Sequence, residues 1–239
     1  MKLPPPQLKG RVSLEEAIVS RRSVRRYRPE PLTLSQLSQI LWAAQGITET
    51  RKLRAAPSAG ATYPLELFAL VGEQTVIALA NQISEPFTSY HSEGKKRPKN
   101  LVQDKPHKET VKQSLDMKSL PAGIYHYDVD SHSLGLHLQG DFRLNLARAA
   151  LDEGFIATAP VDIVICALYT RTSYRYGRRG ERYVHMEVGH VGENIHLQAV
   201  AIELSTVEVG AFDDEEVRKI LGLEEQIKPL YIMPIGKSL

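Results

Sequence analysis

The chain has 239 residues, of which 42% are hydrophobic and 24% charged, a composition ordinary for a globular protein with a sizeable core. A net formal charge of +2 is too small for a general attraction to nucleic acid, so we expect no nucleic-acid partner and only local basic character. The single cysteine, Cys166, excludes an intramolecular disulfide and a cysteine zinc cluster. Since neither a signal-peptide pattern nor a long apolar run is present, we expect a cytoplasmic protein without a membrane partner.

Two helices are predicted near the N-terminus. Ser13 followed three residues later by Glu16 is a capping-box pattern, which predicts a short helix over residues 13–21. Thr33 is placed to cap a second helix, which ends at Gly46. The second helix has apolar residues spaced for one buried face: Leu34, Leu37, Ile40 and Leu41.

Between these helices the sequence SRRSVRRYR, residues 20–28, holds five arginines in nine residues. Guanidinium groups offer a planar fork of donors that suits phosphate, and a serine hydroxyl adds one more donor. A solvated basic face and a phosphate cradle both stay open from this segment alone. A nucleic-acid patch is less favoured, because no aromatic interleaving or second basic stripe supports it.

Small residues follow directly before the first predicted strand. The strand LELFALVG covers residues 65–72, and the residues ahead of it include Pro57, Ser58, Ala59, Gly60 and Ala61. Such a run lets the backbone approach a flat ligand closely and offers N–H donors to its polar edge. A tight turn without a ligand explains the same residues.

Residues 73–119 are predicted to be a loop or lid inserted into the domain. The first residues, EQTVIALANQI, are compatible with a helix. The sequence that follows, HSEGKKRPKNLVQDKPHKET, is polar and basic with few apolar anchors, which is typical of an exposed loop.

Helices and strands alternate in the second half of the chain. The predicted elements are a hairpin over 122–140 with its turn at 128–133, a helix over 141–151, a buried strand over 159–169, a helix over 183–204 and a strand over 230–236. Asp213 and Asp214 begin a further helix, where acidic residues favour the helix dipole, so they need no catalytic role, and we expect no metal site. The hairpin argues against a simple parallel series and predicts an α+β fold.

Five segments of the chain, taken in order, resemble the flavin-dependent nitroreductase family and most closely its SagB-type, azoline-dehydrogenase-like branch. They are SRRSVRRYRPEPLTLSQLSQILWAAQG, RAAPSAGATYPLELFALVG, LPAGIYHYD, RYGRRGERYVHMEVGHVGENIHLQAVAIEL, and VGAFDDEEVRKILGL with PLYIMPIGK. The resemblance covers most of the chain outside 73–119. It implies one domain over 1–239 with the nitroreductase fold, a central, mainly antiparallel sheet flanked by helices, in an intertwined homodimer with helix 183–204 in the dimer core.

The resemblance also implies an FMN site built by both chains. The FMN phosphate and ribityl chain are expected on Arg21, Arg22, Ser23 and Arg25. The segment expected to reach the same flavin from the other subunit is Pro57, Ser58, Ala59 and Gly60. The loop expected beside the isoalloxazine ring, with a backbone N–H near N5, is Val209, Gly210 and Ala211. Lys237 is expected to help neutralise the phosphate.

The chain departs from the family pattern at two places. Many nitroreductases have asparagine and glutamine where this chain has Ala61 and Tyr63, the form usual in the SagB-like branch. Azoline-forming members use a lysine–tyrosine pair as acid and base, and the matching pair is Arg175–Tyr176. An arginine is effectively never deprotonated, so Tyr176 is the remaining candidate proton donor, with a surface or packing role as the alternative.

The resemblance implies an FMN-dependent oxidoreductase. In that role NADH or NADPH reduces the flavin, and a small electron acceptor then takes the hydride in a ping-pong cycle. Two alternatives stay open: an azoline-type dehydrogenase in peptide modification, and a non-catalytic flavin-binding protein.

Overall fold

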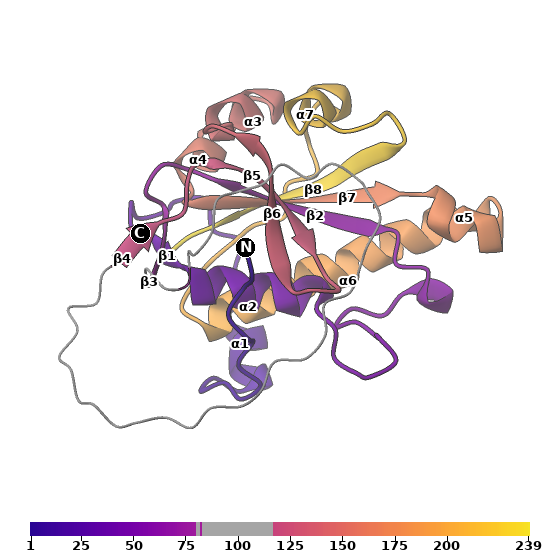
Figure 1. Ribbon diagram of the computed structural model, residues 1–239, viewed down its shortest axis with the longest axis horizontal. Helices are drawn as coiled ribbons and strands as arrows, with labels where there is room; N and C mark the ends of the chain where they lie inside the picture. Colours follow the sequence, from indigo (N-terminus) through magenta and orange to yellow (C-terminus); the bar gives the residue numbers. More distant parts are fainter. Residues whose placement is uncertain (80–81, 83–116) are drawn as a thin grey trace, which may run out of the picture.

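The computed structural model describes residues 1–79, 82 and 117–239 of the chain (Figure 1). Its centre is a five-stranded sheet in the order β6-β5-β2-β7-β8, and every neighbouring pair is antiparallel. The strands are β2 (Leu65–Val71), β5 (Gly123–Asp128), β6 (Ser133–Gln139), β7 (Val161–Leu168) and β8 (Ile227–Ile235). The expected antiparallel sheet and the hairpin turn after Asp128 are therefore confirmed.

Strand β7 lies inside the sheet, between β2 and β8, and both of its faces are covered. Ile163 and Ile165 belong to one hydrophobic cluster, while the alternate residues Val164 and Cys166 belong to the other. This period of two explains why the continuous apolar run of the strand is buried throughout. Cys166 is fully buried, as expected, and burial raises the pKa of its thiol.

Helices cover both faces of the sheet (Figure 1). One face packs against α2 (Leu34–Gln45) and α6 (Arg179–Ala201), and the other against α3 (Arg143–Ala149), α4 (Gly154–Thr158) and α7 (Asp214–Ile220). The short helix α1 (Leu14–Ser20) packs on α6, and α5 (Thr170–Tyr176) leads into it. The chain is therefore a three-layered α+β domain.

The two N-terminal helices start where the capping patterns predict. In α1 the Ser13 N–H donates to the Glu16 carboxylate at 2.7 Å, and the Ser13 hydroxyl accepts from the Glu16 N–H at 3.1 Å. In α2 the same reciprocal pair joins Thr33 and Gln36, at 2.9 and 3.2 Å. These bonds satisfy backbone donors that a helix start leaves unpaired.

Both ends of the 73–119 segment differ from the expected exposed loop. Strand β3 (Val76–Leu79) pairs in parallel with β1 (Leu32–Thr33) and antiparallel with β4 (Met117–Ser119). The compatibility of residues 73–83 with a helix was therefore misleading. Alternate residues of β3 are buried, which is the pattern of a strand rather than of a helix face. The expected lid itself falls on residues 80–81 and 83–116, which lie outside the described residues.

Helix α6 begins four residues before the expected start at residue 183. Its first turn is mostly exposed and basic, so it lacks the apolar spacing on which the expectation relied. Gly180 is buried there, and a Cβ at this position would come within 2.7 Å of the Ser173 backbone. The close approach of α5 to α6 therefore requires glycine, a steric constraint that hydrophobic periodicity does not reveal.

Candidate functional site

The arginine segment is an extended stretch that leaves α1 and runs beside the chain that follows α6. The backbone of Ser23 forms a parallel bridge with Thr206, and the Val24 N–H donates to the Thr206 carbonyl at 3.0 Å. Arg22 donates from Nη1 to the carbonyls of Val19 and Arg21, which caps the end of α1. The guanidinium groups of this segment are thus presented on a fixed backbone.

The C-terminal strand brings a further cation to this place. The Arg28 N–H donates to the Lys237 carbonyl at 2.9 Å, so residues 21–28 lie beside the end of the chain. The Lys237 ammonium pairs with Glu30 at 2.7 Å and is about 40% exposed. Among the described residues, Arg21 and Arg25 form no ion pair, although the charge of Arg21 helps to lower the pKa of Glu208 and the Arg25 guanidinium lies 5.9 Å from the centroid of the Phe155 ring.

The segment after α6 completes this cluster of backbone segments. Ser205 pairs with Gly236, and Val209 pairs with Ile232 in a second isolated bridge. The Val209 N–H donates to the Ile232 carbonyl at 2.9 Å, and its side chain is buried. Of the three residues expected beside a flavin ring, Gly210 and Ala211 alone are exposed, and their N–H groups donate to no other described residue.

The run of small residues lies elsewhere, against α5. Residues 59–61 form one turn of 3-10 helix, and Gly60 has a φ of +59°. A Cβ on Gly60 would come within 2.6 Å of the Tyr176 hydroxyl and 2.9 Å of the Arg175 guanidinium. The structure therefore brings Tyr176 to the small-residue segment, where glycine permits both the backbone conformation and the close contact.

Helix α6 separates the two groups of expected site residues. Ser58 hydrogen-bonds Glu187, whose carboxyl is buried, and burial raises the pKa of that carboxyl. The Arg22 carbonyl instead contacts His196 on the same helix, at 3.1 Å. Positions nine residues apart are about 13.5 Å apart along a helix. The arginine segment and the small-residue segment therefore lie at two separate places along α6 of a single chain, each a candidate half-site.

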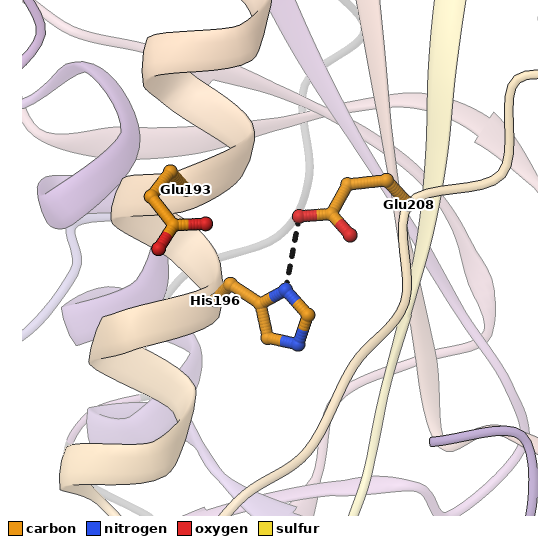
Figure 2. Close-up of side chains that lie close together, drawn as sticks. All are labelled: Glu193, His196 and Glu208. Atoms are coloured by element: carbon orange, nitrogen blue, oxygen red, sulfur yellow. Dashed lines mark hydrogen bonds and ion pairs between the residues drawn. The ribbon is translucent and has the colours of Figure 1, made fainter. Parts of the chain in front are cut away.

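Three side chains beside the arginine segment lie close enough together to hold a metal ion. Among the described residues, no other group of three His, Cys, Asp or Glu side chains does so. The potential ligand atoms of Glu193, His196 and Glu208 lie within 4.8 Å of one another (Figure 2). Both ring nitrogens of His196 already have protein partners, at 2.9 Å from Glu208 and 3.1 Å from the Arg22 carbonyl. In this arrangement the imidazole offers no lone pair to a metal, and the absence of a metal site stays a prediction.

The two aspartates after residue 211 have the structural role that the sequence indicates. Asp213 is the N-cap of α7, and its Oδ1 accepts from the Glu216 N–H at 2.9 Å. Asp214 lies in the first turn of the helix. Both carboxylates therefore stabilise the helix start, where negative charge is favourable.

A cavity of about 1130 Å³ opens on the sheet beside the small-residue segment, where Thr62 and Tyr63 line it, although none of the expected flavin contacts does. Within it, the Glu66 carboxylate contacts His126 at 2.6 Å and Arg171 at 2.5 Å. Although burial alone raises the pKa of Glu66, the hydrogen bond from His126 and the charge of Arg171 hold it below its usual range. Sequence reasoning missed this cluster. The sequence signal for the cluster was a titratable residue inside each of two largely apolar strands, Glu66 in β2 and His126 in β5.

Comparison with known proteins relates the chain to one family. The family model described as the Nitroreductase family matches residues 18–237. The Methanocaldococcus jannaschii protein MJ1384, a nitroreductase by name, is 39% identical over 228 residues, which are 95% of this chain and 92% of that protein.

None of the helices that the structure describes combines the length and apolar character needed to cross a membrane.

Two solved structures share the fold. A nitroreductase-named protein of Ralstonia eutropha JMP134 superimposes with a TM-score of 0.72 and 22% identity, over 100% of this chain and 89% of that chain. A chain of the Escherichia coli microcin synthetase McbBCD, in complex with truncated pro-MccB17, gives a TM-score of 0.65 and 19% identity, over 90% and 67% of the two chains. At these sequence identities the two structures support the fold of this chain and do not establish its chemistry.

Proposed function

The chain belongs to the nitroreductase family, and we propose that it is an FMN-dependent oxidoreductase that uses NADH or NADPH to reduce a small electron acceptor. One observation carries the proposal. The family match spans residues 18–237, and within it the arginine segment, Lys237 and the loop after α6 are adjacent in space. Bound FMN would accept a hydride from the nicotinamide and pass it to the acceptor.

The donor set of the arginine segment fits the anionic end of FMN. Arg21 and Arg25 carry unpaired positive charge, and the Ser23 hydroxyl lies on the same extended backbone. Charge-assisted hydrogen bonds from guanidinium to phosphate are among the strongest in proteins. Lys237 adds positive charge from the C-terminal segment. Its ammonium group, now paired with Glu30, would then contact both Glu30 and the phosphate.

The other end of the flavin would meet the loop after α6. Gly210 and Ala211 expose backbone N–H groups that other described residues do not use. Fixed N–H donors beside a flavin ring stabilise the negative charge of its reduced form. Val209 is bonded within the fold, so its role is to hold the loop in place rather than to donate.

We further propose that the working unit is a homodimer in which the small-residue segment of one chain completes the half-site of its partner. The separation of the two half-sites along α6 supports this arrangement. So do the exposed apolar side chains of α1, because an interface would remove them from water. Leu14, Ile18 and Val19 of this short helix are 61%, 54% and 69% exposed.

In the dimer Tyr176 would stand near the flavin, because it contacts Gly60 within the small-residue segment. Its ring packs edge-on against Tyr183, with ring centroids 5.0 Å apart. This contact orients the phenol, which makes Tyr176 our candidate proton donor to the acceptor. Arg175 holds the turn by donating to the Gly60 carbonyl at 3.3 Å, a positioning role that needs no deprotonation.

Anaerobic reduction tests the proposed activity. The purified protein, supplied with FMN, is mixed with NADH or NADPH in the absence of oxygen, and the flavin absorbance is followed. We expect bleaching with at least one nucleotide and recovery on addition of a nitroaromatic or quinone acceptor. Flavin that binds but never bleaches would indicate a passive flavin carrier. A protein that binds no FMN would exclude the proposal altogether.

A second candidate function is an azoline-type dehydrogenase acting on a peptide. The observation that favours it is the shared fold with a chain of the microcin synthetase complex that has truncated pro-MccB17 bound. Oxidation of a thiazoline or oxazoline removes two hydrogens from the peptide, and the flavin would receive them. Incubation with an azoline-containing peptide, followed by mass spectrometry, distinguishes this function by the loss of those two hydrogens.

A further inference from the structure

His196 is a buried titratable residue that the proposed hydride transfer does not use. It lies on α6 and is 1% exposed. Its Nδ1 is 2.9 Å from the Glu208 carboxylate, as Figure 2 shows, and its Nε2 is 3.1 Å from the Arg22 carbonyl. A carboxylate oxygen and a carbonyl oxygen both accept hydrogen bonds, so each ring nitrogen faces an acceptor.

This geometry disfavours a neutral imidazole as long as the Glu208 carboxylate is ionised. A neutral ring has one N–H donor, so its second nitrogen would direct a lone pair at an oxygen lone pair, in a place that solvent does not reach. An unmet contact of this kind costs about 1–3 kcal/mol, and more when a charged group is involved. A doubly protonated ring donates in both directions and satisfies both oxygens.

We propose that His196 is a buried imidazolium that fastens the arginine segment and the loop after α6 to the same turn of α6, and that it is the positioning residue of the flavin half-site. One bond holds the backbone of Arg22, the middle one of the three arginines expected on the phosphate. The other holds Glu208, immediately before the loop expected beside the ring. The effect of His196 on flavin binding depends on the proposed function, whereas the charge state of its ring does not.

The charges around the ring agree with this assignment. From the segment after α6 comes Glu208, from the arginine segment Arg21, and from α6 itself Glu193. Burial lowers the pKa of His196, but the hydrogen bond and charge of Glu208 outweigh burial and the opposing charge of Arg21, so the pKa lies above its ordinary value. The same bond lowers the pKa of Glu208.

The pH window of this contact follows from the two directions. Because folding raises the His196 pKa, the contact contributes its full stability below about pH 6.5, the pKa of the unfolded state. This stability is lost as pH rises through the pKa of the folded state. A lowered Glu208 pKa gives stability that is present above the unfolded value and is lost as pH falls through the folded value. The two segments are therefore held most firmly between the unfolded pKa values of Glu208 and His196, and the contact weakens as pH rises through the raised pKa of His196.

The first test measures the ring directly and needs no flavin. In protein labelled with ¹⁵N-histidine, we expect the two nitrogens of His196 to show the chemical shifts of a protonated ring at pH 7, with the signals assigned by their loss in His196→Gln. Glu208→Gln should convert the ring to the neutral form, because the amide donates to Nδ1 while Nε2–H keeps its bond to Arg22. A neutral His196 in the wild type at pH 7 overturns the proposal. So does Zn²⁺ binding that disappears in His196→Gln.

The second test measures flavin retention against pH in wild type and Glu208→Gln. Because the FMN phosphate itself titrates, the informative quantity is the ratio of the two dissociation constants at each pH. We expect wild-type affinity to fall about fivefold or more between pH 6.5 and 9 relative to the variant. His137→Gln is the control, since His137 hydrogen-bonds the Leu221 carbonyl and pairs with no carboxylate in the part of the chain that the structure describes. Its affinity should follow the wild-type curve.

The two failures are distinguishable. If neither protein binds FMN at any pH, the proposed function fails while the NMR result still decides the charge of His196. If FMN binds and the ratio does not change with pH, the positioning role of His196 is wrong although the flavin site stands.

Discussion

Asp162 is a buried carboxyl group on β7 that has no hydrogen-bond partner among the described residues. It is fully buried, and both of its oxygens are unpaired. Burial raises its pKa well above the ordinary value, and the nearby charge of Arg143 offsets this only in part. The folded chain therefore keeps the Asp162 proton to higher pH than the unfolded chain does, and stability falls as pH rises from the unfolded pKa, about 3.9, towards the folded pKa.

Asp162→Asn should stabilise the protein at pH 7. The amide has nearly the same shape and needs no proton uptake on folding, so we expect a gain in unfolding free energy on the order of 1 kcal/mol or more. The gain should shrink toward pH 4, where the unfolded aspartate is itself partly protonated. Urea unfolding at both pH values measures it. Asp152→Asn, at an exposed position, is the control, and an equal effect of both substitutions would contradict the explanation.

Arg22→Glu should abolish FMN binding and leave the fold intact. The substitution reverses a charge in the segment assigned to the phosphate, while the exposed Arg22 side chain bonds, among the described residues, to the Val19 and Arg21 carbonyls at the end of α1 and leaves the backbone contact with His196 in place. Arg148→Glu makes the same change of charge on α3, outside the arginine segment, and should retain FMN. Circular dichroism reports folding and ultrafiltration reports bound flavin. Stoichiometric FMN in Arg22→Glu would show that the phosphate lies elsewhere.

At the scale of elements, α2 depends on a capping box at its first turn. Thr33→Ala removes the acceptor for the Gln36 N–H and should cost about 1 kcal/mol of stability. The expected change is a lower midpoint of thermal or urea unfolding. Thr33→Ser keeps the acceptor and should restore most of the loss. Equal destabilisation by both variants would mean that the Thr33 methyl group, rather than the cap, provides the stability.

The strands β3 and β4 predict that residues 83–116 are dispensable for the fold. Leu79 and Met117 are directly paired, so a short turn can join the two strands without changing their register. A chain with that replacement should keep its unfolding midpoint within a few degrees, measured by circular dichroism. Loss of folding would show that the described sheet depends on the removed residues.

Sequence patterns predicted the elements whose burial is regular and missed those set by local sterics. The capping boxes at Ser13 and Thr33 and the apolar run of β7 located their elements closely. The start of α6 was missed because its first turn is exposed. Strand β3 was missed because four residues are too few to distinguish a period of 2 from one of 3.6.

For the whole molecule, the sequence predicted which segments lie side by side better than it predicted the side-chain contacts between them. The arginine segment, Lys237 and the loop after α6 are adjacent, as the family pattern implies. The bonds of His196, by contrast, join positions 174 and 12 residues apart along the chain, which no local pattern encodes. The cavity around Glu66 was likewise invisible, because its residues come together only when β2 and β5 pair.

A mixed dimer tests the two-chain site most directly. Arg22→Glu disables the phosphate half of a site, and Ala59→Glu places a negative charge in the small-residue half. If each site combines the arginine segment of one chain with residues 57–60 of the other, a dimer of the two variants has both defects in one site and leaves the second site intact. The two variants, carrying different tags, are co-expressed, and the dimer holding both tags is isolated.

The decisive measurement is the FMN content of that mixed dimer. The proposal predicts about one FMN per two chains in the mixed dimer and almost none in either variant alone. A mixed dimer without FMN, beside a wild-type protein that binds it, would place each site within a single chain and contradict the arrangement proposed for this protein.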